Sequence, residues 1–136
     1  MEKLTKITFI AEDLSNRDSV TFLIRKIQEL KRINQYDINV IEWNHKPGQY
    51  QDHRELVINE LNGNHFWSLG TSDELPDTYI DNRWNIRTVL QEIGPDIIHF
   101  EESPENFVDF PTDIQEWIYS NQRTWRIVES CQSSTF

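Results

Sequence analysis

IRTVLQEIGPDIIHFE, residues 86–101, is the stretch that decides the fold class. Its first half carries apolar residues at the three- and four-residue spacing of a helix with one buried face: Ile86, Val89, Leu90 and Ile93. Gly94 and Pro95 end this helix, because glycine accepts the left-handed conformation at a helix end and proline cannot continue it. The apolar run DIIHFE (96–101) indicates a buried strand. A helix that turns directly into a buried strand is half of a βαβ unit, which indicates a parallel sheet.

The rest of the chain repeats this alternation. Four further strands are predicted, at residues 3–11, 38–43, 65–69 and 124–131. Apolar residues at helical spacing predict three further helices, over about residues 15–30, 50–61 and 111–121. The sequence therefore predicts a Rossmann-like three-layer α/β/α sandwich, with a mostly parallel sheet of about five strands and right-handed crossovers. The length of 136 residues is enough for one such domain, spanning 1–136.

The composition excludes several classes of partner. The formal net charge is −10, from 23 acidic and 13 basic residues, and the basic residues are scattered. A phosphate-binding surface needs clustered lysine and arginine, so neither nucleic acid nor an anionic membrane is expected as a partner. No apolar run approaches the ~18 residues of a membrane helix, and residues 1–30 have no signal-peptide pattern. The single cysteine, Cys131, excludes a disulfide framework and favours a reducing, cytoplasmic location.

Polar side chains follow four of the predicted strands. In an open parallel sheet, ligands bind beyond the carboxyl ends of the strands. The polar residues that the sequence places there are Glu12, Asp13, Ser15, Asn16, Asn44, His45, Lys46, Glu101, Glu102, Ser103, Glu105, Asn106, Gln132, Ser133 and Ser134. Carboxylates, amides and hydroxyls suit a neutral, hydroxyl-rich ligand such as a sugar better than a phosphate. The alternative interpretation is that loops at strand ends are polar in most proteins.

Other kinds of site lack their sequence patterns. Neither G-x-G-x-x-G nor G-x-x-x-x-G-K-[ST] is present, and no cofactor is expected. The histidines show no spacing typical of metal ligands and no Asp-x-Asp pair is present, so no metal is expected either. Ser133 and Ser134 lack the G-x-S-x-G turn of a hydrolase nucleophile. His99 lies inside a predicted strand and is interpreted as a core histidine with a hydrogen-bond partner.

Three segments resemble one family of enzymes. The stretch IRTVLQEIGPDIIHFEESPENF (86–107) resembles the helix, strand and loop of retaining glycosyltransferases of family 4, the GT4 type, which have the GT-B fold. In those enzymes an apolar helix leads to a PD-apolar-apolar-H strand, and an acidic loop with a proline follows. The terminal TWRIVESCQSSTF (124–136) is similar to the next strand and loop of the family, and residues 6–30 fit its first strand and helix.

The resemblance implies that residues 1–136 are the amino-terminal, acceptor-side domain of a two-domain glycosyltransferase. The nucleotide-sugar donor then belongs to a second Rossmann-like domain, and this domain alone is expected not to transfer sugar. The substrate-binding residues implied are Asp13, Ser15, Asn16, Glu101, Glu102, Ser103, Ser133 and Ser134. Gln132 stands where the family has a histidine and is the implied catalytic position. The family's paired glycines in the first loop are replaced by residues around Leu14, and a family histidine after the fourth strand is replaced by Glu101.

Two alternatives stay open. One is a non-catalytic binding or assembly module built on a degenerate glycosyltransferase half, which Gln132 and the missing glycines favour. The other is a receiver-like signalling domain, because Glu12 and Asp13 after the first strand resemble the acidic pocket of that fold. HFWSLG (65–70) carries no acceptor aspartate, however, and no lysine occurs beyond Lys46. An exposed partner face on such a domain also predicts self-association.

Overall fold

The structure is a computed structural model that describes residues 3–14, 17–44, 51–61, 65–70, 83–107, 109–121 and 124–130. Within these ranges, five parallel strands form one sheet in the order β3-β2-β1-β4-β5. The strands are β1 (Thr5–Ala11), β2 (Tyr36–Glu42), β3 (Phe66–Ser68), β4 (Ile97–Phe100) and β5 (Arg126–Glu129). The helices are α1 (Arg17–Ile33), α2 (Gln51–Glu60), α3 (Ile86–Ile93) and α4 (Thr112–Ser120), with short 3-10 helices η1 (Arg83–Asn85) and η2 (Pro104–Asn106).

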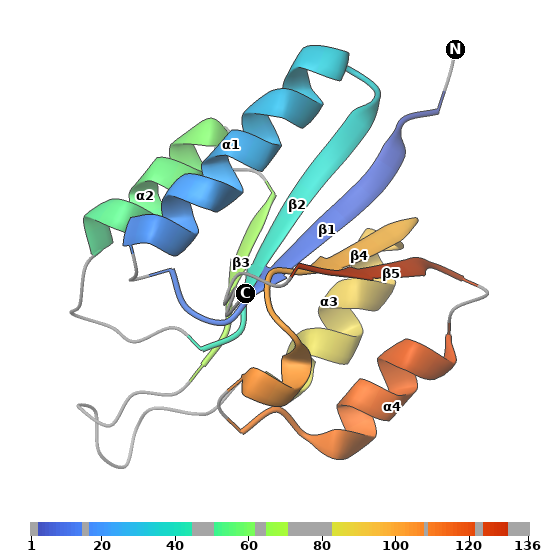
Figure 1. Cartoon of the computed structure of the whole chain (residues 1–136). Helices are drawn as coiled ribbons and strands as arrows, with labels where there is room; N and C mark the ends of the chain where they lie inside the picture. Colours follow the sequence, from blue (N-terminus) through green and yellow to red (C-terminus); the bar gives the residue numbers. More distant parts are fainter. Residues whose placement is uncertain are drawn as a thin grey trace, which may run out of the picture.

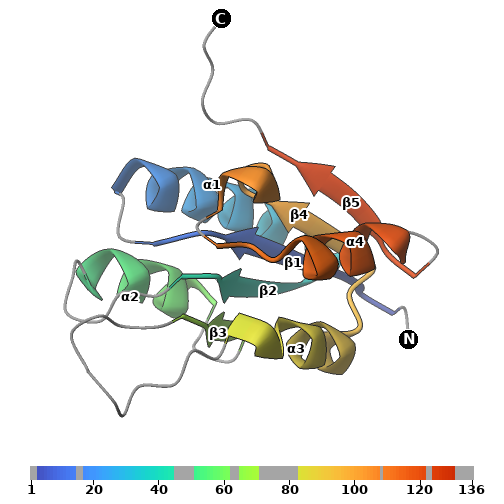
Figure 2. The same ribbon diagram turned by 90° about the horizontal axis from the view of Figure 1, so that it is seen from below.

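Helices cover both faces of the sheet (Figure 1, Figure 2). α1 and α2 lie on one face, and α3 and α4 lie on the other. Side chains of β1 alternate between the two faces: Ile7 and Phe9 pack in the core of α1 and α2, whereas Ile10 packs with α3 and α4. Parallel sheets are buried in this way because their crossover helices lie on both faces. The arrangement confirms the predicted Rossmann-like three-layer α/β fold, and each predicted strand and helix is present.

The ends of the elements follow local signals and strand pairing. Gly94 ends α3 in the left-handed conformation, with φ 59° and ψ 56°, and its N–H donates to the carbonyl of Leu90. Glycine is favoured there because a Cβ is strained at that φ, and the chain then turns directly into β4. The strands predicted at 65–69 and 124–131 are longer than β3 and β5, because pairing with the neighbouring strands covers only 66–68 and 126–129.

β1 is the central strand of the sheet, and the order in which strands are added changes side at β1. From β1 the chain continues to β2 and β3 on one side, and then returns to β4 and β5 on the other. The carboxyl ends of β1 and β4 therefore form a topological switch point, the place where ligands bind in open α/β sheets. The two strand ends are joined directly, because the N–H of Glu101 donates to the carbonyl of Ile10 at 2.9 Å.

One face of β5 is left exposed in the described part of the chain. On the opposite face, Tyr119 of α4 donates a hydrogen bond from its hydroxyl to the carboxylate of Glu129. On the face that α1 and α2 cover elsewhere, Arg126 is exposed and Val128 keeps 44% of its surface accessible. Figure 1 shows α1 beside β2 and β1, away from β5. The side chains that β4 and β5 present on this face are therefore only partly covered.

Candidate functional site

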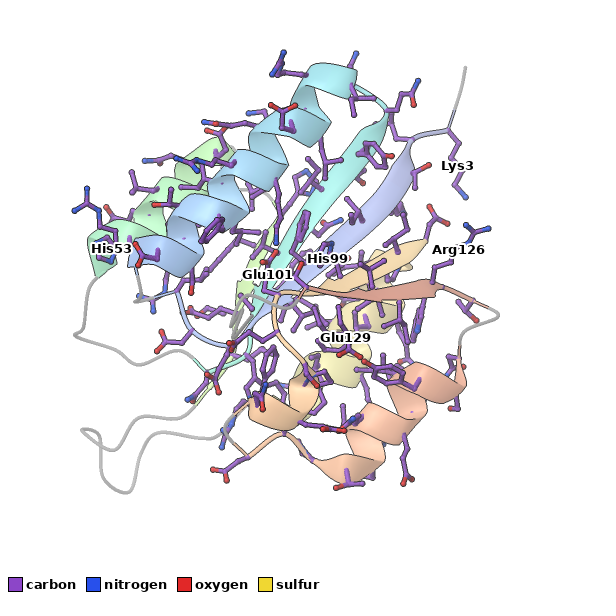
Figure 3. The ribbon with its side chains drawn as sticks, in the orientation of Figure 1. Lys3, His53, His99, Glu101, Arg126 and Glu129 are labelled. Atoms are coloured by element: carbon purple, nitrogen blue, oxygen red, sulfur yellow. The ribbon has the colours of Figure 1, made fainter. Side chains whose placement is uncertain are left out.

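A polar cluster lies at the carboxyl ends of β4 and β5, on the face that α1 partly covers. It consists of Lys26, His99, Glu101 and Ser130, and is called the β4–β5 cluster below. His99 and Glu101 are two residues apart on β4 and its extension, so their side chains point to the same face. Figure 3 shows the two side chains next to each other. Lys26 reaches the cluster from the middle of α1, and Ser130 follows the last residue of β5.

Lys26 and Glu101 form an ion pair within the cluster. The Lys26 Nζ donates to Oε2 of Glu101 at 2.6 Å. The Glu101 side chain is 6% exposed, whereas that of Lys26 is 31% exposed. A charge-assisted hydrogen bond of this length is among the stronger polar contacts in proteins. The shielded carboxylate therefore fixes the position of a partly accessible ammonium group beside the switch point.

His99 and Ser130 are in direct contact. His99 Nε2 lies 2.5 Å from Ser130 Oγ, and Lys26 Nζ donates to the same Oγ at 3.1 Å. Burial disfavours the imidazolium and the Lys26 charge repels it, so the pKa of His99 falls from 6.5 to about 4. The imidazole is therefore neutral at pH 7. In the tautomer with hydrogen on Nδ1, Nε2 accepts the hydroxyl proton of Ser130.

The low pKa of His99 leads to an expected dependence of stability on pH. Between pH 6.5 and about 4 the unfolded chain binds a proton at His99 and the folded chain does not. The free energy of unfolding should therefore fall as the pH is lowered through this window. Among the described residues, Arg25, Lys26 and Glu29 of α1 line the same groove as the imidazole, and Glu101 pairs with Lys26.

The measurement is urea unfolding between pH 4 and 7 for the wild type and for His99→Asn. Asparagine cannot take up a proton, so the variant should lose less stability than the wild type as the pH is lowered. Equal pH slopes for the two proteins would contradict the neutral state assigned to His99.

An apolar groove adjoins the β4–β5 cluster. Its volume is about 380 Å³, and Ile7 and Phe9 of β1 and Leu30 of α1 form its apolar walls. Lys26 and His99 belong to both the groove and the cluster. The Phe9 and His99 rings pack with their centroids 5.0 Å apart, which orients the imidazole. The groove and the cluster thus form one surface with an apolar end and a polar end.

A buried ion pair stabilises the other half of the carboxyl edge. Glu42, the last residue of β2, accepts hydrogen bonds from Arg54 Nε at 2.7 Å and from Arg54 Nη2 at 2.8 Å. The Leu14 N–H and the Ser68 hydroxyl also donate to it, at 2.8 and 2.9 Å. Burial alone would raise the pKa of Glu42, but these hydrogen bonds and the Arg54 charge outweigh burial and hold the pKa below 4.5. Through these hydrogen bonds, Glu42 of β2 connects α2, β3 and the loop after β1.

Four of the predicted site residues lie in the described ranges, and the structure brings them to one edge of the sheet. Asp13 is half-buried in the loop after β1, and Glu101 follows the adjacent strand β4. Glu102 and Ser103 are half-buried immediately after Glu101. The Ser103 carbonyl accepts a hydrogen bond from the Asn106 N–H, which shapes this loop. Five predicted residues lie outside the described residues: Ser15, Asn16, Gln132, Ser133 and Ser134.

Several residues of the site are not found by reasoning from the sequence. Lys26 and Ser130 are missed, although Lys26 lies next to the apolar stripe of its helix, a position from which a long side chain reaches the sheet. Glu42 carries a visible signal, because it is the acidic residue of the apolar run INVIEW (38–43). His99 has the hydrogen-bond partner expected of it, but its ring is half-buried at the groove and not enclosed in the core.

Comparison with protein-family models, with curated proteins and with solved structures found no match to this chain. The structure provides two further findings about what the described residues contain. They include no group of three or more His, Cys, Asp or Glu side chains placed to hold a metal ion. None of the helices in these ranges is long and apolar enough to cross a membrane. Function is therefore inferred from the arrangement of the side chains.

Proposed function

We propose that this chain is the acceptor-side domain of a GT-B glycosyltransferase and that its carboxyl edge binds a hydroxyl-rich acceptor such as a sugar. The observation that carries the proposal is the position of Asp13, Glu102 and Ser103 beside the switch point between β1 and β4. Carboxylates accept hydrogen bonds from sugar hydroxyls, and a serine hydroxyl both donates and accepts them. A few such groups at the end of a parallel sheet are typical of small-molecule sites.

The charges at this edge favour a neutral ligand over a phosphate. Lys26 is paired with Glu101, so the two side chains together add no net charge to this edge. Asp13 and Glu102 add carboxylates from the two neighbouring loops. An anionic ligand would meet this excess of negative charge, whereas a neutral sugar would not. The nucleotide-sugar donor is accordingly assigned to a second Rossmann-like domain, and the present domain is proposed to bind acceptor without transferring sugar.

The test is an NMR titration of amide resonances with methyl glycosides of glucose, mannose and N-acetylglucosamine. We expect saturable shifts at Asp13, Glu102 and Ser103, with a weak affinity on the order of mM for a half-site. Glu102→Gln should weaken binding about tenfold, because a hydrogen bond to a charged acceptor is worth more than one to an amide. Glu116→Gln, on an exposed position of α4, is the matched control and should leave the affinity unchanged.

Two results would count against acceptor binding at this edge. One is the absence of saturable shifts with all of the glycosides. The other is tighter binding of inorganic phosphate at the same amides. Transfer of sugar from a nucleotide-sugar by this domain alone would contradict the assignment of the donor to a second domain.

A further inference from the structure

We propose that the β4–β5 cluster is an acyl-transfer site in which Ser130 is the nucleophile, His99 its general base and Lys26 the group that stabilises the oxyanion. This inference goes beyond acceptor binding, which needs none of these three roles. The proposed substrate class is an ester whose acyl group is apolar. The inference depends on the contacts among three side chains and on the groove beside them.

The first observation is the contact between nucleophile and base. His99 Nε2 lies 2.5 Å from Ser130 Oγ, a direct contact in which the serine hydroxyl can pass its proton to the imidazole. His99 is neutral at pH 7, so its Nε2 can accept that proton. Ser130 is half-buried and follows the last residue of β5, so it lies at the edge of the sheet where ligands bind.

The second observation is the position of Lys26. Its Nζ lies 3.1 Å from Ser130 Oγ and 2.6 Å from Glu101 Oε2. When a carbonyl carbon bonds to Ser130 Oγ, the carbonyl oxygen is one further bond away, within reach of the ammonium group. Glu101 holds the ammonium group in place before the reaction, and preorganised positive charge of this kind stabilises a developing oxyanion. Glu101 therefore acts as a positioning residue, through Lys26.

The third observation is the apolar groove. Ile7, Phe9 and Leu30 form its walls, and Lys26 and His99 lie at the end that meets Ser130. A groove of about 380 Å³ accommodates a short or medium acyl chain with its carbonyl carbon at Ser130. Arg25 and Glu29 also line the groove and carry opposite charges, so the apolar surface of Ile7, Phe9 and Leu30 selects the acyl group, and aliphatic esters are the expected substrates.

The reaction balances without a further reagent. Ser130 Oγ attacks the ester carbonyl carbon while its proton passes to His99 Nε2, and the oxyanion forms beside Lys26. The bond from carbon to the alcohol oxygen then breaks, and the leaving alcohol takes the proton from His99. Water attacks the acyl-serine in the second half, gives a proton to His99, and releases the carboxylic acid. The proton on His99 returns to Ser130 Oγ.

The experiment treats the whole chain with an alkyl fluorophosphonate, which phosphonylates activated serines and releases fluoride. We expect one adduct per chain, located at Ser130 by peptide mass spectrometry. Ser130→Ala should lose the adduct, and His99→Asn should slow labelling by about 100-fold or more, the usual contribution of a general base. Ser120→Ala is the control, because Ser120 is exposed at the end of α4 and its hydroxyl donates to the Trp117 carbonyl; labelling of this variant should equal that of the wild type.

Hydrolysis of p-nitrophenyl butyrate supplies the second measurement. Lys26→Met should lower kcat/KM about 100-fold through loss of oxyanion stabilisation. Ser130→Cys keeps a nucleophile at the position, and peptide mass spectrometry should locate an iodoacetamide adduct at residue 130 separately from any adduct at Cys131. The proposal is overturned by the absence of an adduct on the wild type, by an adduct at another residue, or by Ser130→Ala that hydrolyses the ester at the wild-type rate. Sugar titration of Ser130→Ala reports separately on acceptor binding, because Asp13, Glu102 and Ser103 are unchanged.

Discussion

Arg54→Met is expected to lower the free energy of unfolding by about 3–5 kcal/mol, because it leaves a buried carboxylate without its cation. Glu42 has no exposed surface and the Arg54 side chain is only 6% exposed. The two groups share two hydrogen bonds of 2.7 and 2.8 Å. Methionine replaces the aliphatic stem of arginine and removes only the guanidinium group, so the loss reports mainly on the charge and its hydrogen bonds.

Urea unfolding at pH 7 provides the measurement, and Arg32→Met provides the control. Arg32 pairs with Glu29 on the surface of α1, with both side chains more than half exposed, and its loss should cost less than about 1 kcal/mol. The double variant Glu42→Met with Arg54→Met should recover part of the loss, because no buried charge remains. A loss below about 1 kcal/mol for Arg54→Met alone would show that the pair does not determine stability.

The Glu42–Arg54 pair should also make the free energy of unfolding depend on pH. The pKa of Glu42 lies below its ordinary value of 4.5 in the folded protein, so the pair contributes stability above pH 4.5 that is lost as the pH falls through the folded-state pKa. In Arg54→Met, the cation is lost while burial remains, so we expect the pKa of Glu42 to rise. The difference in stability between the wild type and the variant should therefore shrink as the medium is acidified.

Phe100→Ala is expected to cost about 3–5 kcal/mol through the cavity that it leaves under β4. The Phe100 ring has no exposed surface, and three aromatic rings of the α3 and α4 face surround it. The Tyr119 ring stacks on it at a centroid distance of 6.1 Å, and the Phe107 and Phe110 rings meet it edge-on at 6.0 and 6.2 Å. The three surrounding rings are themselves packed in or against the core and cannot move fully into the space that Phe100 leaves. Most of the cavity should therefore remain.

Phe22→Ala is the matched control for this substitution. Phe22 lies on α1 with 51% of its surface exposed, so the same chemical change there creates no cavity. We expect a loss of less than about 1 kcal/mol in urea unfolding, as for other surface positions. Equal losses for the two phenylalanine variants would contradict the assignment of Phe100 to the core.

The fold could be predicted from the sequence because each of its elements carries its own local signal. Gly94 and Pro95 mark the end of one helix, and the apolar run at 38–43 marks a strand, whatever the rest of the chain does. The expectation that Asp13 and Glu101 share one edge follows from a general property of parallel sheets.

The contacts of the site could not be predicted in the same way. Lys26 meets Glu101 and Ser130 across 75 and 104 residues of sequence. Which charged residue of α1 faces β4 depends on the rotation and the distance of the packed helix. A lysine on a helix normally indicates an exposed position, and only the packed structure shows it bridging two strand ends. The burial of Arg54 could likewise not be predicted, because its partner Glu42 belongs to a different element.

The central position of β1 also has a consequence for synthesis of the chain on the ribosome. Its partner on one side, β2, emerges soon after it, but its partner on the other side, β4, follows much later, as the bond between Lys6 and Asp96 spans 90 residues. At translation rates of roughly 5–20 residues per second, one edge of the nascent β1 stays unpaired for roughly 5–20 s. Such an edge offers unsatisfied backbone groups to other chains, so the nascent protein is most open to aggregation, and to chaperone binding, during that interval.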